Sequence, residues 1–291
     1  MKKFRDSKAL LLAVALVAML ALALAGCGEK EEESGASDEA ATEIPAKADL
    51  PTVEPGTLTI ATDKPAYPPY FEDDDPSNGK GFESAVAYAV AERLGFTKDE
   101  VKWVVVPFDS SYAPGKKKFD FDINQISITD ERKKAVSFSS PYYTAPQAVV
   151  AAEDSSIADA KSLADLKDAQ LGGQVGTTSL TTINDVIKPS KKARVYNNSN
   201  DVVSAFKNGQ IDGIVVDLPT AFYLTAAELE NAKIVGSINS PGGDQWGLLL
   251  EKGSELTQYV SAAIDELEAK GTLREITDQY LGGGAGVSEL K

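Results

Sequence analysis

Residues 194–216 read RVYNNSNDVVSAFKNGQIDGIVV, and this stretch decides the fold class. Strand-forming residues at 194–196 precede a helical pattern at 201–207, and the apolar run 211–216 follows as a second strand. Strands that alternate with helices predict parallel sheets covered by helices on both faces. We therefore expect an α/β protein.

The same alternation extends outward from this stretch in both directions. Further strands are expected at 57–62, 101–106, 119–123, 171–175, 233–235 and 245–250. Helices are expected at 82–94, 179–187, 219–227, 254–270 and 272–280.

The elements at the two ends of this pattern are each incomplete alone, which predicts a lobe made from both of them. We expect lobe 1 to combine 57–146 with 240–281, lobe 2 to be the insertion 147–239, and a tail to follow at 282–291. The crossovers between the lobes are predicted at 144–150 and 237–244. Because α/β sheets place ligands at the carboxyl ends of their strands, the cleft between the lobes is the expected binding site.

The first 26 residues have the features of a secretory signal. Lys2, Lys3, Arg5 and Lys8 precede an uninterrupted apolar run over 9–25. The run ends in LAGC at 24–27, which resembles the bacterial lipobox, in which the cysteine is acylated and becomes the new amino terminus. The alternative is a retained transmembrane anchor, because 17 apolar residues approach the length that spans a bilayer. Either interpretation places the domain outside the cytoplasm, and lipidation of Cys27 would hold it at the membrane.

Residues 27–56 are predicted to be a flexible tether. They contain the charged run EKEEE at 29–33 and almost no large apolar side chains. Such a segment buries too little surface to offset the entropy of ordering it. A tether of this kind lets a domain work some distance from a membrane.

Composition excludes several functions. The formal net charge of −15 is unfavourable for binding DNA or RNA, so no nucleic-acid partner is expected. The chain has no histidine, which rules out a Ser–His–Asp triad, a Cys–His dyad and imidazole metal ligands. Its single cysteine cannot form an internal disulfide. We expect no cofactor, no metal and no catalytic residues.

A series of polar motifs follows the predicted strands. In chain order they are Asp63 with YPPY at 67–70, FDFDINQISITDERKK at 119–134, SSPYY at 139–143, GTTS at 176–179 and IVVDLP at 214–219. From about Thr57 to Leu281 the chain resembles the amino-acid-binding family of bacterial ABC-transporter solute-binding proteins, solute-binding family 3. The resemblance implies the two-lobe periplasmic-binding-protein fold of type II, with mainly parallel sheets.

The resemblance also implies which residues contact the α-carboxylate and the α-ammonium of the ligand. An amino acid carries a carboxylate and an ammonium on one carbon, so its site needs a cation and an anion close together. Arg132 matches the arginine that grips the carboxylate with a planar fork, and Asp217 matches the residue that receives the ammonium. Thr177 and Thr178 match small polar residues that open a helix, and Ser127 matches a hydroxyl that touches both groups.

The side chain of the ligand would meet a second set of residues. Tyr67, Tyr70 and Phe108 match aromatic walls of the family site, and Asp63 matches a contact to a distal polar or cationic group. The chain departs from the family at Asn124 and Gln125, where a serine and a glycine are common. With Gln245, these amides offer donors and acceptors and favour a polar ligand.

Each of these residues also has a purely structural interpretation. Arg132 could be a surface ion-pair partner, Asp217 and the Thr177–Thr178 pair could cap helices, and the aromatic residues could be ordinary core. The leading functional hypothesis is capture of a polar amino acid by a monomer that delivers it to an ABC-transporter permease. Alternatives are an enzyme similar to the cyclohexadienyl dehydratases that share the fold, or a ligand-sensing module.

Overall fold

The computed structural model describes residues 42–239, 243–282 and 286–291. The predicted signal segment 1–26, the lipidation residue Cys27 and the first half of the predicted tether, 27–41, lie outside the described residues. Within the described ranges, no helix combines the length and apolar character needed to cross a membrane.

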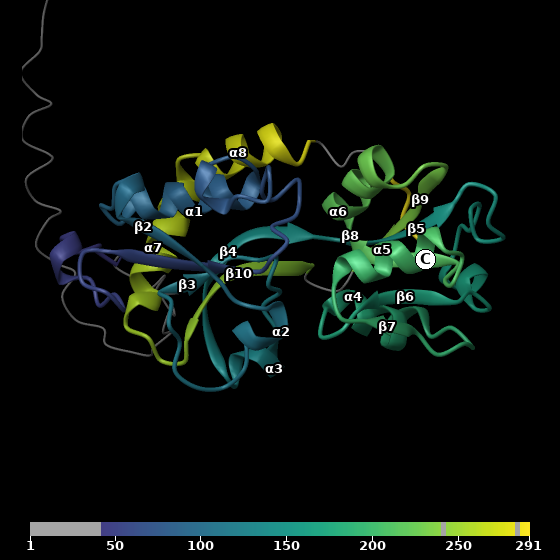
Figure 1. The fold of residues 1–291 in the computed structure, drawn as a ribbon, viewed down its shortest axis with the longest axis horizontal. Helices are drawn as coiled ribbons and strands as arrows, with labels where there is room; N and C mark the ends of the chain where they lie inside the picture. Colours follow the sequence, from purple (N-terminus) through teal and green to yellow (C-terminus); the bar gives the residue numbers. More distant parts are fainter. Residues whose placement is uncertain (1–41, 240–242, 283–285) are drawn as a thin grey trace, which may run out of the picture. The chain divides into compact units, whose positions relative to one another are not determined.

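Lobe 1 is built on a sheet of five strands in the order β2-β1-β3-β10-β4 (Figure 1). Its strands are β1 (Leu58–Thr62), β2 (Val101–Val105), β3 (Phe121–Asp122), β4 (Val136–Ala145) and β10 (Asp244–Glu251). Its helices are α1 (Phe82–Arg93), α2 (Phe108–Ser111), α3 (Asp130–Lys133), α7 (Leu256–Ala269) and α8 (Thr272–Tyr280). Because β10 pairs with β3 and β4, segments far apart in the sequence share this sheet.

Lobe 2 is built on a second sheet of five strands, in the order β7-β6-β8-β5-β9. Its strands are β5 (Gln147–Ala152), β6 (Leu171–Gln174), β7 (Arg194–Tyr196), β8 (Gly213–Asp217) and β9 (Ala232–Ile238). Its helices are α4 (Thr178–Thr181), α5 (Ser199–Lys207) and α6 (Leu218–Tyr223). Helices α4 and α6 continue as π-helical turns at Thr182–Ile187 and Leu224–Glu228, and short 3-10 helices lie at Lys47–Asp49, Pro76–Asn78, Lys98–Glu100 and Leu163–Leu166.

The predicted fold class is confirmed. In each sheet a single strand opposes its neighbours, β10 in lobe 1 and β5 in lobe 2, so the sheets are mainly parallel. The decisive stretch 194–216 forms β7, α5 and most of β8, and β6 lies between the two strands as their common parallel partner.

Strands β4 and β5 were not among the strands predicted. The buried positions of β4 recur at every third residue rather than every second, and its register against β10 shifts around Pro141, so the alternation that signals a strand is lost. The chain passes from the first sheet to the second between Ala145 and Gln147, within the crossover predicted at 144–150.

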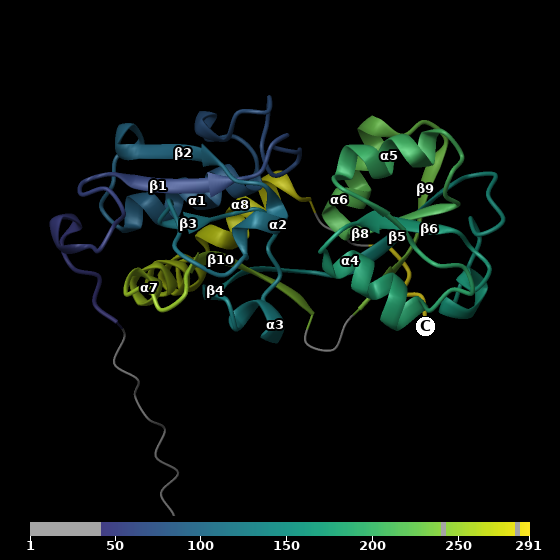
Figure 2. The ribbon, with the colours of Figure 1, turned by 60° about the horizontal axis from the view of Figure 1, so that its bottom comes forward.

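Apolar side chains at helical spacing hold α1 on its sheet. Phe82, Val86 and Val90 are fully buried in the core of lobe 1, together with Leu58 and Ile60 of β1. Figure 2 shows α1 and α8 behind the strands of this sheet, and the same core contains apolar residues of α7 and α8. Lobe 2 has an apolar core on each face of its own sheet, as a sheet covered on both sides requires.

The structure differs from the predicted tether in its last residues. Leu50 is only 6% exposed and belongs to the core of lobe 1, and the Val53 N–H donates to Asp120 Oδ1 at 2.7 Å. The packed part of lobe 1 therefore begins before Thr57, because one leucine in a polar stretch is enough to anchor it.

The predicted tail also packs, in this case on lobe 2. Ser237 of β9 donates to the Ser288 carbonyl at 2.9 Å and accepts from the Leu290 N–H at 2.8 Å. Leu290 is 3% exposed and lies over Gly236, where a Cβ would be only 2.6 Å from Leu290 Cγ. Residues 288–290 thus extend the edge of the lobe 2 sheet, and a side chain at Gly236 would block them.

Candidate functional site

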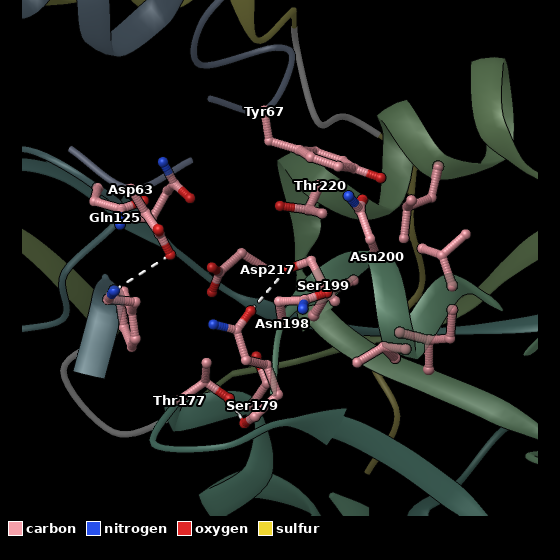
Figure 3. Close-up of a pocket in the computed structure, with 18 of the residues that line it drawn as sticks. Asp63, Tyr67, Gln125, Thr177, Ser179, Asn198, Ser199, Asn200, Asp217 and Thr220 are labelled. Atoms are coloured by element: carbon pink, nitrogen blue, oxygen red, sulfur yellow. Dashed lines mark hydrogen bonds between the residues drawn. The ribbon is translucent and has the colours of Figure 1, made fainter. Parts of the chain in front are cut away.

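A pocket of ≈ 1030 Å³, including its open mouth, lies between the two lobes (Figure 3). Of the predicted binding residues, those that line it are Asp63, Tyr67, Phe108, Asn124, Gln125, Ser127, Thr177, Thr178 and Asp217. Three do not line it, namely Arg132, Tyr70 and Gln245. The pocket wall also contains polar residues that were not among the predicted binding residues: Lys64, Gln174, Ser179, Asn198, Ser199, Asn200 and Thr220.

Several polar residues of the pocket wall lie at or just after the carboxyl ends of strands. Asp63 follows β1, Asn124 follows β3, Asp217 ends β8 and Asn198 follows β7. The carboxyl ends of parallel strands meet at one edge of each sheet, and the two edges face the same pocket. The same rule that identified Asp217 would have found Asn198, which follows the predicted strand 194–196.

Asp217 is one of two acidic residues among the described residues that line the pocket, and Figure 3 shows its side chain directed into it. It occupies the position before helix α6, but its side chain does not cap that helix. Gln147 Nε2 donates to Asp217 Oδ1 at 2.5 Å. Burial, reinforced by the negative charge of Asp244, raises the pKa of Asp217 to about 8. Asp217 is therefore a carboxylate that a bound cation would stabilise in its ionised form.

Arg132 lies behind the pocket rather than in its wall. It is 7% exposed, which excludes the interpretation as a surface ion-pair residue. Nη1 donates to the Ser127 carbonyl at 2.7 Å, and Nη2 donates to the Gly176 carbonyl of lobe 2 at 2.9 Å. The guanidinium also stacks on Phe108 and Tyr112, with its central carbon 5.4 and 4.8 Å from the ring centres.

The close approach at Gly176 requires a glycine. Its φ of +75° is unfavourable for other residues, and a Cβ there would lie 2.2 Å from the Tyr112 hydroxyl. Glycine thus brings its carbonyl to Arg132, directly before the two threonines that line the pocket.

Thr177 and Thr178 have different tasks at the start of α4. The Thr177 hydroxyl caps the helix by accepting from the Leu180 N–H, so the structural interpretation of this side chain is correct. The Thr178 hydroxyl instead faces lobe 1, where it donates to Asp244 Oδ2 at 2.6 Å and lies 3.2 Å from Ser127 Oγ. Thr178 therefore links the lobes at the edge of the pocket.

A buried glutamate holds the loop that departs from the family pattern. Gln125 has a φ of +47°, a conformation that favours glycine, which explains why a glycine is common there. Glu83 Oε1 accepts from the Gln125 backbone N–H at 2.6 Å and from the Tyr142 hydroxyl, while Oε2 accepts from the Gln125 amide. These bonds hold Gln125 against the pocket in a strained conformation.

Two carboxyl groups behind this loop titrate at unusually high pH. Burial raises the pKa of Glu83 to about 7, although its hydrogen bonds oppose the shift. Burial and the negative charge of Glu83 raise the pKa of Asp122 well above its ordinary value. Neither oxygen of Asp122 has a hydrogen-bond partner among the described residues. Sequence pattern could not reveal this pair, because Glu83 and Asp122 lie on separate elements.

The aromatic residues divide between the pocket and the core. Tyr67 lines the pocket and packs edge-to-face on Tyr223, with ring centres 5.4 Å apart. Phe108 also lines the pocket, and its N–H donates to Asp63 Oδ2 at 3.2 Å. Tyr70 is 1% exposed in the core of lobe 1, and its hydroxyl reaches Thr220 Oγ1 across the lobes at 2.8 Å. The structural interpretation is thus the correct one for the Tyr70 ring.

Gln245 lies away from the pocket because of strand geometry. Successive side chains of a strand point to opposite faces. On β10, Asp244 and Trp246 are buried and Gln245 is exposed. The residue of this strand that is linked to the site is Asp244, one position before the predicted one: it lies behind the wall and accepts from the pocket-lining Thr178.

Comparisons with known proteins agree with this architecture. Residues 58–283 match the family described as bacterial extracellular solute-binding proteins, family 3. The L-arginine-binding protein of Pseudomonas aeruginosa is 32% identical over 76% of this chain and 90% of its own length. The L-cystine-binding protein TcyJ of Escherichia coli K12 is 30% identical, over 79% and 84% of the two chains.

Solved structures of amino-acid-binding proteins are also similar to this chain. An ancestral arginine-binding protein bound to glutamine matches with a TM-score of 0.66 and 32% identity, covering 79% of this chain and 99% of that one. The substrate-binding protein of an amino acid ABC transporter matches with a TM-score of 0.63 and 26% identity, covering 77% and 99%. The family model spans most of the chain and both predicted lobes. The chain belongs to family 3 of the bacterial extracellular solute-binding proteins, and its role is to bind a substrate.

Proposed function

We propose that the protein captures an amino acid with a polar side chain between its lobes and delivers it to the permease of an ABC transporter. The observation that supports this most is the pairing of opposite charges at one pocket. Asp217 lines the wall, and Arg132 lies directly behind Ser127 and Gly176. In this proposal Asp217 receives the ammonium, and Arg132 with the start of α4 attracts the carboxylate.

The remaining wall favours a side chain that forms hydrogen bonds. Amides and hydroxyls line it from both lobes: Asn124, Gln125, Gln174, Asn198, Ser199, Asn200 and Thr220. Asp63 adds a carboxylate that accepts the backbone N–H groups of Lys64 and Phe108, while the ammonium of Lys64, which also lines the pocket, pairs with Asp74. Relatives named for arginine, histidine and cystine are consistent with a polar ligand.

Calorimetry with L-arginine, L-glutamine, L-histidine, L-cystine and L-leucine tests the ligand class. We expect one or more polar amino acids to bind and L-leucine to bind at least about 100-fold more weakly, because an apolar side chain would leave buried amides without partners. Preferential binding of L-leucine would contradict the proposed class.

We further propose that the protein is a binding component without catalytic activity, held outside the cytoplasm by lipidation of Cys27. The relatives above are named as binding proteins, which supports the first part. An amino acid recovered unchanged after prolonged incubation supports it, and conversion of the ligand would overturn it. Mass spectrometry of protein from bacterial membranes tests the anchor, since acylation would begin the mature chain at Cys27. A Cys27→Ala variant should leave the membrane fraction.

A further inference from the structure

A chain of hydrogen bonds behind the pocket joins the two lobes. Ser127 and Thr178 meet through their hydroxyls at 3.2 Å, and Thr178 Oγ1 donates to Asp244 Oδ2 at 2.6 Å. Gln147 Nε2 donates to Asp244 Oδ2 at 2.9 Å and to Asp217 Oδ1 at 2.5 Å. Asp244 and Gln147 are 8% and 1% exposed and connect three residues that line the pocket.

The carboxylate of Asp244 fixes the direction of this chain. A carboxylate can only accept, so the Thr178 hydroxyl proton is committed to Asp244. The hydrogen bond between the two hydroxyls must then be donated by Ser127. This leaves the Ser127 oxygen free to act only as an acceptor toward the pocket, which suits a ligand that donates.

The carboxylate of Asp244 also adds negative charge close to Asp217. Asp217 and Asp244 share the single amide nitrogen of Gln147. Gln147 Oε1 is buried and has no hydrogen-bond partner among the described residues. In the pocket wall, Asp217 supplies a carboxylate and Ser127 supplies an accepting hydroxyl, while Asp244 and Gln147 Oε1 lie buried behind the wall. A negative charge and acceptors of this kind suit an ammonium group.

We propose that Asp244 is a positioning residue for the ammonium of the ligand. Through Gln147 it orients Asp217, through Thr178 it turns Ser127 into an acceptor, and it adds a second negative charge behind the pocket wall. The inference rests on the proposed function, because it assumes that an amino acid occupies this pocket.

The experiment compares amino acids with analogues that lack only the α-ammonium. Wild type, Asp244→Asn and Asp244→Ala are titrated with L-arginine and 5-guanidinopentanoate, and with L-glutamine and 4-carbamoylbutanoate, near pH 8.5. Asparagine keeps an acceptor for Thr178 and Gln147 but removes the charge. We expect Asp244→Asn to bind the amino acids about 10-fold more weakly and Asp244→Ala about 100-fold, with changes below about twofold for the analogues. Glu268→Gln, an exposed change of equal charge in lobe 1, should change neither.

A pH profile adds a readout that a purely structural role would not move. Ammonium binding needs ionised Asp217, so wild-type affinity should fall as the pH is lowered from about 8.5 to about 6. The charged and titratable groups that influence Asp217 are Asp244, Glu83, Arg132, Tyr70 and Tyr143. Removing the charge of Asp244 lowers the pKa of Asp217, so the midpoint should move to lower pH in Asp244→Asn.

Two results would overturn the inference alone. They are equal losses for an amino acid and its analogue in Asp244→Asn, or an unchanged pH midpoint in that variant. If wild type bound neither these two amino acids nor the others of the calorimetry panel, the proposed function would fail as well.

Discussion

Arg132 and Asp217 are the two charged residues expected to hold an amino acid, and the protein surrounds them in opposite ways. Two backbone carbonyls and two aromatic rings already surround the Arg132 guanidinium. Asp217 has a neutral amide and a second carboxylate as neighbours and faces the pocket. The guanidinium already has acceptors and aromatic faces from the protein, whereas the carboxyl group of Asp217 is left to gain from a positively charged ligand.

Replacing Arg132 should produce the largest effect. Arg132→Ala removes a buried charge and the donors that bridge Ser127 and Gly176 across the lobes. We expect binding of the best amino acid to weaken by about 2–5 kcal/mol in calorimetry. Lys133→Ala, an exposed change on the same short helix, is the matched control. Unchanged affinity in Arg132→Ala would show that the guanidinium has no part in binding.

Replacing Asp217 should weaken binding less. Asp217→Asn keeps the size of the side chain and loses the charge that pairs with the ammonium. Affinity should fall by about 1–3 kcal/mol for amino acids. The same variant should bind the des-amino analogues nearly as wild type does, and a comparable loss for both classes would argue against an ammonium contact.

The unliganded protein should lose stability as the pH rises toward 8. The folded pKa of Asp217 is about 8, far above that of an unfolded aspartate, so the folded state holds a proton that the unfolded state releases. Stability from this group is complete below the unfolded pKa and is lost as the pH rises through the folded one. Between pH 6 and 8 the unfolding free energy should fall by about 2 kcal/mol from Asp217 alone.

Denaturant titrations at several pH values measure this slope. Glu83, with a pKa raised to about 7, acts in the same direction, so Asp217→Asn should flatten the slope without abolishing it. A steeper slope in Asp217→Asn would contradict the assignment.

The smallest effect is expected at the contact between Tyr70 and Thr220. Tyr70→Phe removes one hydroxyl bond across the lobes and leaves the ring in the core of lobe 1. Amino-acid affinity should fall by about 0.5–1 kcal/mol, the value of one neutral hydrogen bond. Tyr88→Phe, whose hydroxyl reaches Ser77 within lobe 1, is the control and should leave affinity unchanged.

Sequence pattern could predict the scaffold because strand ends and helix faces are local features. The apolar spacing of 82–94 predicted α1, and the end of an apolar strand predicted that Asp217 would meet the pocket. The residues that set the pKa and the hydrogen bonding of Asp217 are far from it in the sequence. Gln147 opens β5 and Asp244 opens β10, almost 100 residues later, and only pairing of strands within the two sheets brings them to it.

Two errors have an equally simple physical origin. Gln245 was predicted in place of Asp244 because both are polar and lie at the start of the strand. Their sequence does not indicate which of them points toward the interior of the protein. Tyr70 and Phe71 are adjacent aromatics, and both turned into the core of lobe 1, so their sequence could not assign one of them to a ligand.

Leu50 is anchored in lobe 1 and Leu290 in lobe 2, so a distance measured between residues near them reports on the separation of the two lobes. Val53 and Glu289 are exposed neighbours of these two anchors. Fluorescent dyes attached at the two positions would each report on a different lobe and leave the pocket untouched. If the lobes close on a bound amino acid as proposed, the distance between the dyes would change, and cysteines introduced at the two positions would make the protein a biosensor.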